Sequence, residues 1–97
     1  MIGRIYRLVD HDNDMIYIGS TTKTLDQRLG KHKTDFKRWL KGTGDYRTSF
    51  LVLESENYSI ELLEECSVES MNDLYKIEGK HQKEANNNCV NHRIMRS

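Results

Sequence analysis

The sequence predicts a small α/β (α+β) domain, because β-rich runs and two amphipathic stretches share 97 residues. The first two runs, residues 3–9 and 15–20, are rich in isoleucine, valine and tyrosine and are separated by a polar stretch at 10–14. Such runs around a short polar loop are typical of a β-hairpin. A chain of this length folds as one compact unit, so we expect a single domain over residues 1–97.

Side chains in the predicted hairpin alternate between the two faces of the sheet. Tyr6 shares a face of the first strand with Arg4 and Leu8, and Tyr17 shares a face of the second strand with Gly19. The register between the strands decides whether the two tyrosines lie on the same side. A sequence alone leaves that register open.

An amphipathic helix is predicted over about residues 25–41. Thr24 or Thr22 can cap its start, because a threonine hydroxyl accepts a hydrogen bond from a free N–H of the first turn. Gly42 and Gly44 follow its end, where glycine is favoured. Both ends therefore carry the signals of helix termini.

One face of this helix is predicted to pack on the core. Its apolar stripe consists of Leu25, Leu29, Phe36 and Leu40. Arg28 and His32 lie one turn apart at the edge of the stripe, so we expect both at the boundary between core and solvent. Separately they are typical of a surface cation and of a histidine at a core edge. Together, beside a cleft, they can clamp a phosphate and move a proton near neutral pH.

The second half of the chain predicts another strand and another helix. Residues 58–65 alternate in the manner of a strand, whereas residues 49–55 are ambiguous between helix and strand. The helix begins after Ser67 or Ser70 and runs to about residue 86.

Glu78 is the anomaly of this second helix. It falls in the middle of the predicted apolar face, which is formed by Met71, Leu74, Tyr75 and Ala85. A buried carboxylate must be paired, protonated or bound to a cation. One interpretation is a salt bridge to Arg28 or Lys76, or a helix rolled so that Glu78 reaches the rim. The other is an oxygen ligand for Mg²⁺, which accepts one carboxylate together with substrate phosphate oxygens.

Charge is unevenly distributed along the chain, although the net charge is zero. Residues 23–47 carry eight basic and three acidic residues, a net charge of +5. Residues 54–78 carry eight acidic residues and one basic residue, a net charge of −7. The basic segment favours a nucleic-acid partner, because affinity for a polyanion is mostly electrostatic. Two solvated helix faces are the alternative.

The remaining composition points to an intracellular protein, in the cytoplasm or nucleus. No apolar run approaches the roughly 20 residues that cross a bilayer, and no signal-peptide pattern opens the chain. Cys66 and Cys89 are expected to be free thiols. With His81 and His92 they offer an alternative function, a zinc-bound interaction module.

Six polar residues occur in a distinctive order that covers almost the whole chain: Tyr6 in Ile5-Tyr6, Tyr17 in Tyr17-Ile18-Gly19, then Arg28, His32, Glu78 and Asn91. This order resembles the motif residues of the GIY-YIG nuclease family. In the first strand the glycine stands one position early, giving Gly3-Arg4-Ile5-Tyr6. The resemblance implies a central three-stranded antiparallel sheet flanked by helices, and hydrolysis of a DNA phosphodiester with one divalent metal.

The resemblance also implies catalytic roles. Tyr6 would act as general base or position the water, and Tyr17 would be its partner at the phosphate. Arg28 would stabilise the pentavalent transition state, while His32 would help to take the proton. A phenol can deprotonate a water if cations lower its pKa. Which of Tyr6 and His32 does so stays open, because their roles can be exchanged on geometry that a sequence does not give.

Three further residues complete the implied site. Glu78 would hold one Mg²⁺ or Mn²⁺ per active site. Asn91 would be a supporting hydrogen-bonding residue, and Gly19 would allow close approach of the backbone. One metal and one arginine then supply charge stabilisation while a phenol and an imidazole handle the proton.

The expected partner is DNA, with no membrane, and the expected type is a homing or mobile-element, restriction or repair endonuclease. Residues expected to contact the DNA are Lys23, Lys31, Lys33 and Arg38. One site cuts one strand, so we expect nicking by a monomer, or double-strand cleavage by a transient homodimer. A catalytically silent nucleic-acid-binding module is the alternative.

Overall fold

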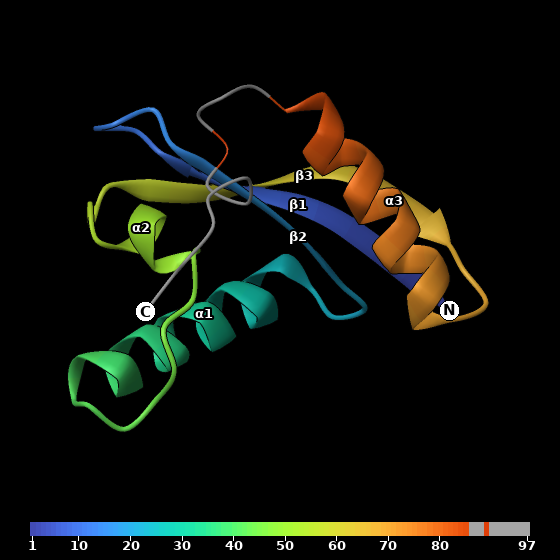
Figure 1. Ribbon diagram of the computed structural model, residues 1–97. Helices are drawn as coiled ribbons and strands as arrows, with labels where there is room; N and C mark the ends of the chain where they lie inside the picture. Colours follow the sequence, from blue (N-terminus) through green and yellow to red (C-terminus); the bar gives the residue numbers. More distant parts are fainter. Residues whose placement is uncertain (86–88, 90–97) are drawn as a thin grey trace.

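The computed structural model describes residues 1–85 and residue 89. Three strands form an antiparallel sheet with β1 (Ile2–Asp10) in the centre and β2 (Ile16–Thr21) and β3 (Tyr58–Ser67) at its edges (Figure 1). The predicted α/β (α+β) class and the three-stranded antiparallel sheet are therefore confirmed. No helix within the described residues is long and apolar enough to cross a membrane.

The register of β1 against β2 places the two tyrosines on the same face. Tyr6 pairs with Gly19, and Leu8 pairs with Tyr17. Directly opposite residues of an antiparallel pair point to the same side of the sheet. Both phenol rings consequently face one helix, and the ring of His32 from that helix contacts each of them edge-on.

The first helix, α1 (Leu25–Leu40), begins at the predicted cap Thr24. The Thr24 hydroxyl accepts a hydrogen bond from the backbone N–H of Gln27 at 3.2 Å, and the Gln27 side chain accepts one from the Thr24 N–H at 3.2 Å. This reciprocal pair satisfies two free donors of the first turn. After the helix Gly42 has a φ of 80°, which favours glycine.

One face of the sheet is covered by α1 and by α2 (Phe50–Leu53). The run at residues 49–55, which the sequence left open between helix and strand, therefore contains a helix. The buried residues of this layer are Tyr6, Leu8, Phe50, Val52 and Leu53. Most of the predicted stripe of α1 packs against them, but Leu40 is 64% exposed, and its assignment to the core was wrong. Adjacent helical residues point about 100° apart, and the larger Trp39, its ring centroid 5.5 Å from that of Phe50, takes the core side.

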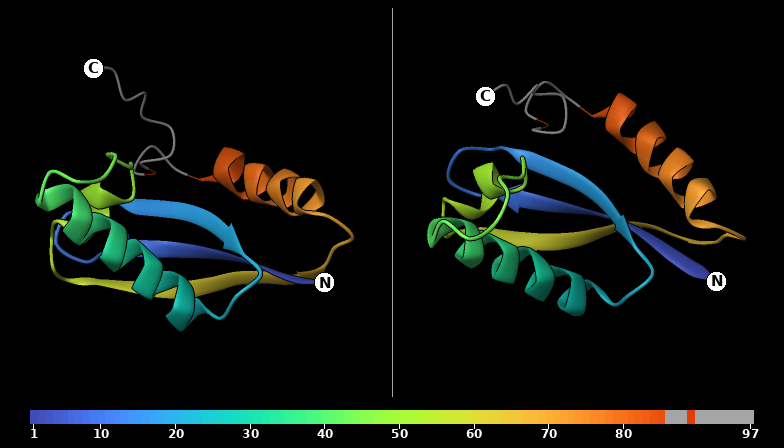
Figure 2. Two further views of the ribbon diagram at one scale, coloured as in Figure 1. Left: turned by 90° about the horizontal axis from the view of Figure 1, so that it is seen from below. Right: turned by 60° about the horizontal axis from the view of Figure 1, so that its bottom comes forward.

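The opposite face is covered by α3 (Met71–Glu84), so the sheet lies between two helical layers (Figure 2). Its cap is Ser70, whose hydroxyl accepts a hydrogen bond from the Asp73 N–H at 3.3 Å. The buried residues here are Ile5, Ile18, Val68, Leu74 and Cys89. At Gly3 a Cβ would lie 2.5 Å from Cδ1 of Leu74, so the glycine makes room for α3 against β1.

The apolar face of α3 is rotated from its predicted position. Leu74 is fully buried and Ile77 packs beside it, whereas Met71 is 37% and Tyr75 is 53% exposed. The prediction that Glu78 lies in the middle of a buried face was therefore wrong. Since Leu74 and Ile77 define the buried side, Glu78 is half-buried at its rim, as in the rolled-helix interpretation.

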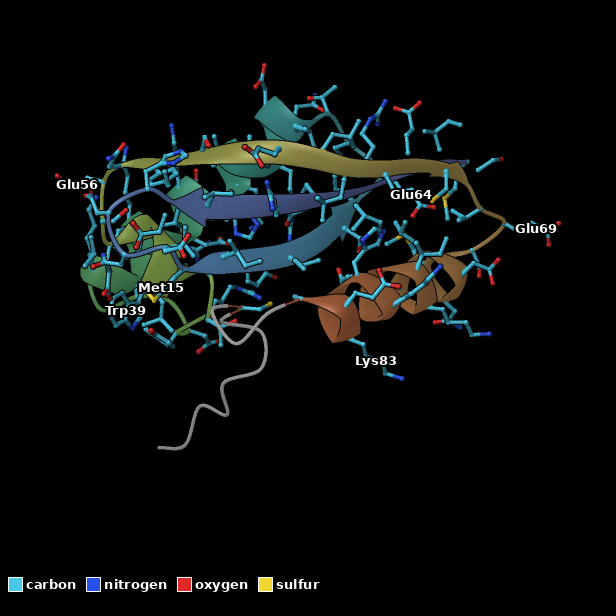
Figure 3. The ribbon with its side chains drawn as sticks, turned by 90° about the horizontal axis from the view of Figure 1, so that it is seen from above. Met15, Trp39, Glu56, Glu64, Glu69 and Lys83 are labelled. Carbon is cyan, nitrogen blue, oxygen red and sulfur yellow. The ribbon has the colours of Figure 1, made fainter. Side chains whose placement is uncertain are left out.

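The acidic and basic segments occupy different elements. Glu56 precedes β3, Glu64 lies within it and Glu69 follows it, so acidic side chains accompany this edge strand along its length (Figure 3). The basic segment spans α1 and the loop after it. This separation leaves α1 as the cationic side of the molecule.

Candidate active site

A hydrogen-bonded line joins Arg28, Tyr6 and His32. Tyr6 lies on the central strand and is fully buried, and the two α1 residues lie one turn apart above it. Nε of Arg28 donates to the Tyr6 hydroxyl at 2.9 Å, and that hydroxyl lies 2.7 Å from Nε2 of His32. His32 is 3% exposed, deeper than the boundary position predicted for it.

Burial sets the protonation states along this line. It raises the pKa of Tyr6, and the neighbouring Tyr17 raises it further, so Tyr6 stays a neutral phenol. Burial, followed by the charge of Arg28, lowers the pKa of His32 to about 4. Arg28 can only donate, so the Tyr6 hydroxyl accepts from it and keeps its own O–H to donate. We assign that O–H to Nε2 of a neutral His32, which places the imidazole proton on Nδ1.

Two residues of β2 complete this side of the site. The ring of Tyr17 packs edge-on against His32 with centroids 5.5 Å apart, and burial raises the pKa of Tyr17. Gly19 faces Tyr6, where a Cβ would overlap the hydroxyl oxygen and lie 2.6 Å from Cζ. The missing side chain therefore leaves the space that the Tyr6 hydroxyl occupies.

Glu78 reaches the same place from α3, on the other side of the edge strand. The Ser20 hydroxyl donates to its Oε1 at 2.7 Å, and the Gln82 amide donates to its Oε2 at 3.1 Å. Gln82 also donates to the carbonyl of Ile18 at 3.5 Å. After burial, the charge of Glu78 is the next cause that raises the pKa of Tyr17, so the carboxylate lies close to the phenols.

A groove of about 460 Å³ lies between α1 and α3 at the end of β2. One wall is cationic and carries Lys23, Arg28 and Lys31, whereas the α3 wall carries Tyr75 and Glu78. An anion in this groove is attracted by the first wall and repelled by the carboxylate. A bound cation at Glu78 would remove that repulsion.

The GIY-YIG catalytic domain family matches residues 2–91. The chain belongs to the GIY-YIG family. Domains of this family share a nuclease-type fold, are usually endonucleases that act on DNA, and generally use a divalent metal. A relative from Invertebrate iridescent virus 6, "Uncharacterized protein 019R", is 31% identical over 77 residues. That match covers 79% of this chain but 27% of the viral protein, and no solved structure matches significantly.

The donor set of this GIY-YIG site suits a metal that needs few protein ligands. Each Glu78 oxygen accepts one of the hydrogen bonds from Ser20 and Gln82, and a carboxylate oxygen has two lone pairs. Within residues 1–85 and residue 89, no three histidine, cysteine, aspartate or glutamate side chains gather to cage an ion. Mg²⁺ is commonly held by one carboxylate, waters and substrate phosphate, so these residues fit it.

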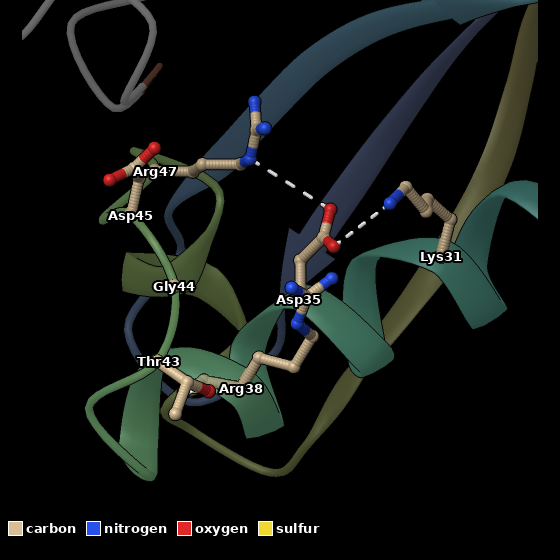
Figure 4. A pocket seen from close by; sticks show the side chains of 7 residues that line it. All are labelled: Lys31, Asp35, Arg38, Thr43, Gly44, Asp45 and Arg47. Atoms are coloured by element: carbon tan, nitrogen blue, oxygen red, sulfur yellow. Dashed lines mark hydrogen bonds and ion pairs between the residues drawn. The ribbon is translucent and has the colours of Figure 1, made fainter.

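A second hollow, of about 230 Å³, adjoins the groove and shares Lys31 with it. Lys31 and Arg47 reach Asp35 from opposite sides, with N–O distances of 3.0 and 3.8 Å (Figure 4). Arg38 lines the same hollow. Three cations therefore stand beside the groove, partly neutralised by Asp35.

Three of the four residues expected to contact DNA lie at the groove or the hollow: Lys23, Lys31 and Arg38. Lys33 instead lines a hollow beside Leu53 and Tyr58. It follows His32 directly on α1 and so points about 100° away from it. The expected contact of Lys33 with DNA stays a prediction, from a position away from the groove. Asn91, expected in the site, and His92, part of the zinc alternative, lie outside the described residues.

Sequence reasoning missed Ser20, Gln82 and Arg47. Gln82 follows Glu78 by four residues and shares its helix face, a spacing that could have indicated a partner. Burial is the largest cause of the raised pKa of Tyr17 and of the lowered pKa of His32. The positive charge of Arg47 acts on both groups and lowers the pKa of each. Arg47 lies in a loop, where no periodic pattern indicates its direction.

Proposed function

We propose that this GIY-YIG domain is a divalent-metal-dependent DNA endonuclease that hydrolyses one phosphodiester bond in the groove. The observation that carries the proposal is the hydrogen-bonded line of Arg28, Tyr6 and His32 on one side of β2, with Glu78 on the other. A charge-stabilising group, a proton path and a metal-binding carboxylate are the parts that phosphodiester hydrolysis requires.

Arg28 is proposed to hold the phosphate. Its guanidinium has five N–H donors, of which the Nε–H bonds Tyr6, and the side chain lines the groove. The hydrogen bond to Tyr6 fixes the orientation of the guanidinium before substrate arrives. Preorganised charge of this kind stabilises the extra negative charge of the pentavalent transition state.

Tyr6 and His32 are proposed to remove the proton of the attacking water. The raised pKa of Tyr6 keeps the phenol protonated, which argues against a Tyr6 phenolate, formed before the reaction, as the base. Tyr6 is fully buried behind Arg28, which lines the groove, so the attacking water must enter beside Arg28 to reach the phenol oxygen. That oxygen can then take the water's proton while the phenol's own proton passes to Nε2 of His32, the acceptor it already faces. The resulting imidazolium lies beside Arg28 and has a pKa of about 4, so it readily releases the proton.

Glu78 is proposed to hold the metal, as Mg²⁺ or Mn²⁺. The bound ion would lower the pKa of the water and neutralise charge on the phosphate oxygens. Ser20 and Gln82 fix the orientation of the carboxylate through its two oxygens. Hydrogen bonds of this kind typically affect metal affinity by tenfold to a hundredfold.

Lys23 and Lys31 are proposed to contact the phosphates that flank the cut. They stand on the cationic wall on which Arg28 also lies. Contacts to phosphates give affinity without sequence information. One such site cuts one strand, so the primary product is a nick.

Conversion of supercoiled plasmid to the nicked form tests this proposal. Wild-type protein with Mg²⁺ should nick the plasmid, and Glu78→Ala should nick it at least about a hundredfold more slowly. Glu84→Ala, which removes an exposed carboxylate from the same helix, is the matched control and should keep wild-type activity. Equal behaviour of wild type and Glu78→Ala across several metals and DNA forms would overturn the assignment.

A further inference from the structure

The α3 wall of the groove carries an exposed apolar surface that the proposed hydrolysis does not use. Tyr75 is 53% exposed and Met71 is 37% exposed, and both line the groove. They lie one turn apart on one face of the helix, and Glu78 follows on the next turn. A single exposed tyrosine is ordinary, but here a pair of apolar side chains stands beside the metal-binding carboxylate and across from Arg28.

We propose that Tyr75, flanked by Met71, is a stacking site for an unpaired nucleobase next to the phosphate held by Arg28. The proposal rests on the nuclease function proposed above and names its class of substrate. A nucleotide has an anionic phosphate and a flat apolar base, and the two walls of the groove offer a partner for each. Aromatic side chains are the usual platforms for bases in single strands.

The base must be unpaired for this contact. Within a duplex both flat faces of a base are covered by its neighbours, and proteins reach only its edges in the grooves. A side chain that stacks on the base beside a bound phosphate therefore requires the base to have left the helical stack. Leaving the stack costs least at single strands, mismatches and frayed or branched ends, so these are the preferred sites.

The ring of Tyr75 is supported for this role by its place on α3. The adjacent Leu74 is fully buried, and Ser70 caps the helix one turn before. The helix that carries Tyr75 is thus anchored to the sheet before DNA binds. A platform on a rigid element loses little conformational freedom on binding.

The experiment compares two fluorescent oligonucleotides of about eight units, one of deoxyadenosines and one of abasic sites with the same backbone. Binding is measured in EDTA by fluorescence anisotropy, so that no strand is cut. Stacking predicts that wild type prefers the adenine strand by about five- to a hundredfold. Tyr75→Ala should bind the adenine strand more weakly and the abasic strand unchanged, because the abasic strand has no base for Tyr75 to contact, so most of the preference should disappear. Tyr75→Phe keeps an aromatic ring and should keep the preference.

Leu40→Ala is the matched control, since Leu40 is an exposed apolar residue outside the groove, and it should bind like wild type. An equal preference for adenine in wild type and Tyr75→Ala, or no preference in wild type, would overturn the stacking site and leave the nuclease proposal intact. Failure of wild type to bind either strand would also overturn the stacking site, whereas the nicking of plasmid with Mg²⁺ tests the nuclease proposal separately. Circular dichroism of each variant separates loss of binding from loss of fold.

Discussion

The hydroxyl of Tyr6 lies 2.7 Å from Nε2 of His32, a histidine that is 3% exposed. Burial and then the charge of Arg28 lower the pKa of this imidazole to about 4. At neutral pH it is therefore an uncharged acceptor for the phenol proton. The protonation of one buried histidine should consequently affect both the activity and the stability of the domain.

The proposed cleavage activity should persist to low pH. If His32 is the final proton acceptor, kcat/KM stays level down to about pH 5 and falls below it, with a midpoint near the pKa of about 4. The measurement is kcat/KM for oligonucleotide cleavage at saturating Mg²⁺ from about pH 3 to about pH 8. An acidic midpoint near 6.5, the ordinary histidine value, would contradict the role given to this buried imidazole.

The stability of the fold should fall as pH drops from about 6.5 to 4. His32 has a lower pKa in the folded than in the unfolded chain, so the unfolded state binds more protons in this window and the free energy of unfolding decreases. The loss is about 3 kcal/mol relative to a variant without the histidine. Urea unfolding of wild type and His32→Gln across this range measures it. Parallel pH profiles for the two proteins would exclude the depressed pKa.

Gly19→Ala should abolish activity by displacing Tyr6. The new Cβ would overlap the phenol oxygen, and the buried ring has little space to move. We expect at least a hundredfold loss of cleavage and about 1–3 kcal/mol of stability. The matched control is Gly30→Ala on α1, whose Cβ meets nothing within 4 Å and which should raise stability by up to about 1 kcal/mol. Retained cleavage in Gly19→Ala would show that Tyr6 needs no such space.

Ser20→Ala should weaken metal binding without unfolding the protein. Its hydroxyl donates to Oε1 of Glu78, so its loss leaves the carboxylate held, among the described residues, by Gln82 alone. The Mg²⁺ concentration for half-maximal cleavage should rise about tenfold to a hundredfold, while the rate at saturating metal falls less. Ser67→Ala, an exposed serine at the end of β3, is the control. An unchanged Mg²⁺ dependence would remove Ser20 from the site.

Local signals predicted the elements of the fold well. The Thr24 cap, the polar loop before β2 and the glycine after α1 act within a few residues, so a sequence displays them directly. The pairing of Tyr6 with Gly19 depends on register instead, which the loop and the packing of two faces decide together. The structure was therefore needed to show that Tyr6 and Tyr17 lie on the same face of the sheet.

The candidate site was predictable in its residue types but less so in its geometry. Arg28 and His32 are one turn apart on one helix, and this spacing alone places them together. Glu78 was misplaced because the rotation of α3 depends on where Leu74 and Ile77 meet the sheet, which helical periodicity does not contain. The direction of Arg47 depends on the path of a loop and had no sequence signal at all.

The most direct test of the proposed site is the single-turnover rate of DNA cleavage by Arg28→Ala, measured together with its affinity for the same DNA. Arg28 orients Tyr6 and faces the groove, so its loss should slow cleavage about 10² to 10³-fold. Affinity should fall by less than about tenfold, since Lys23 and Lys31 remain on the same wall. A cleavage rate equal to that of wild type would contradict a catalytic site built on Arg28, Tyr6 and His32.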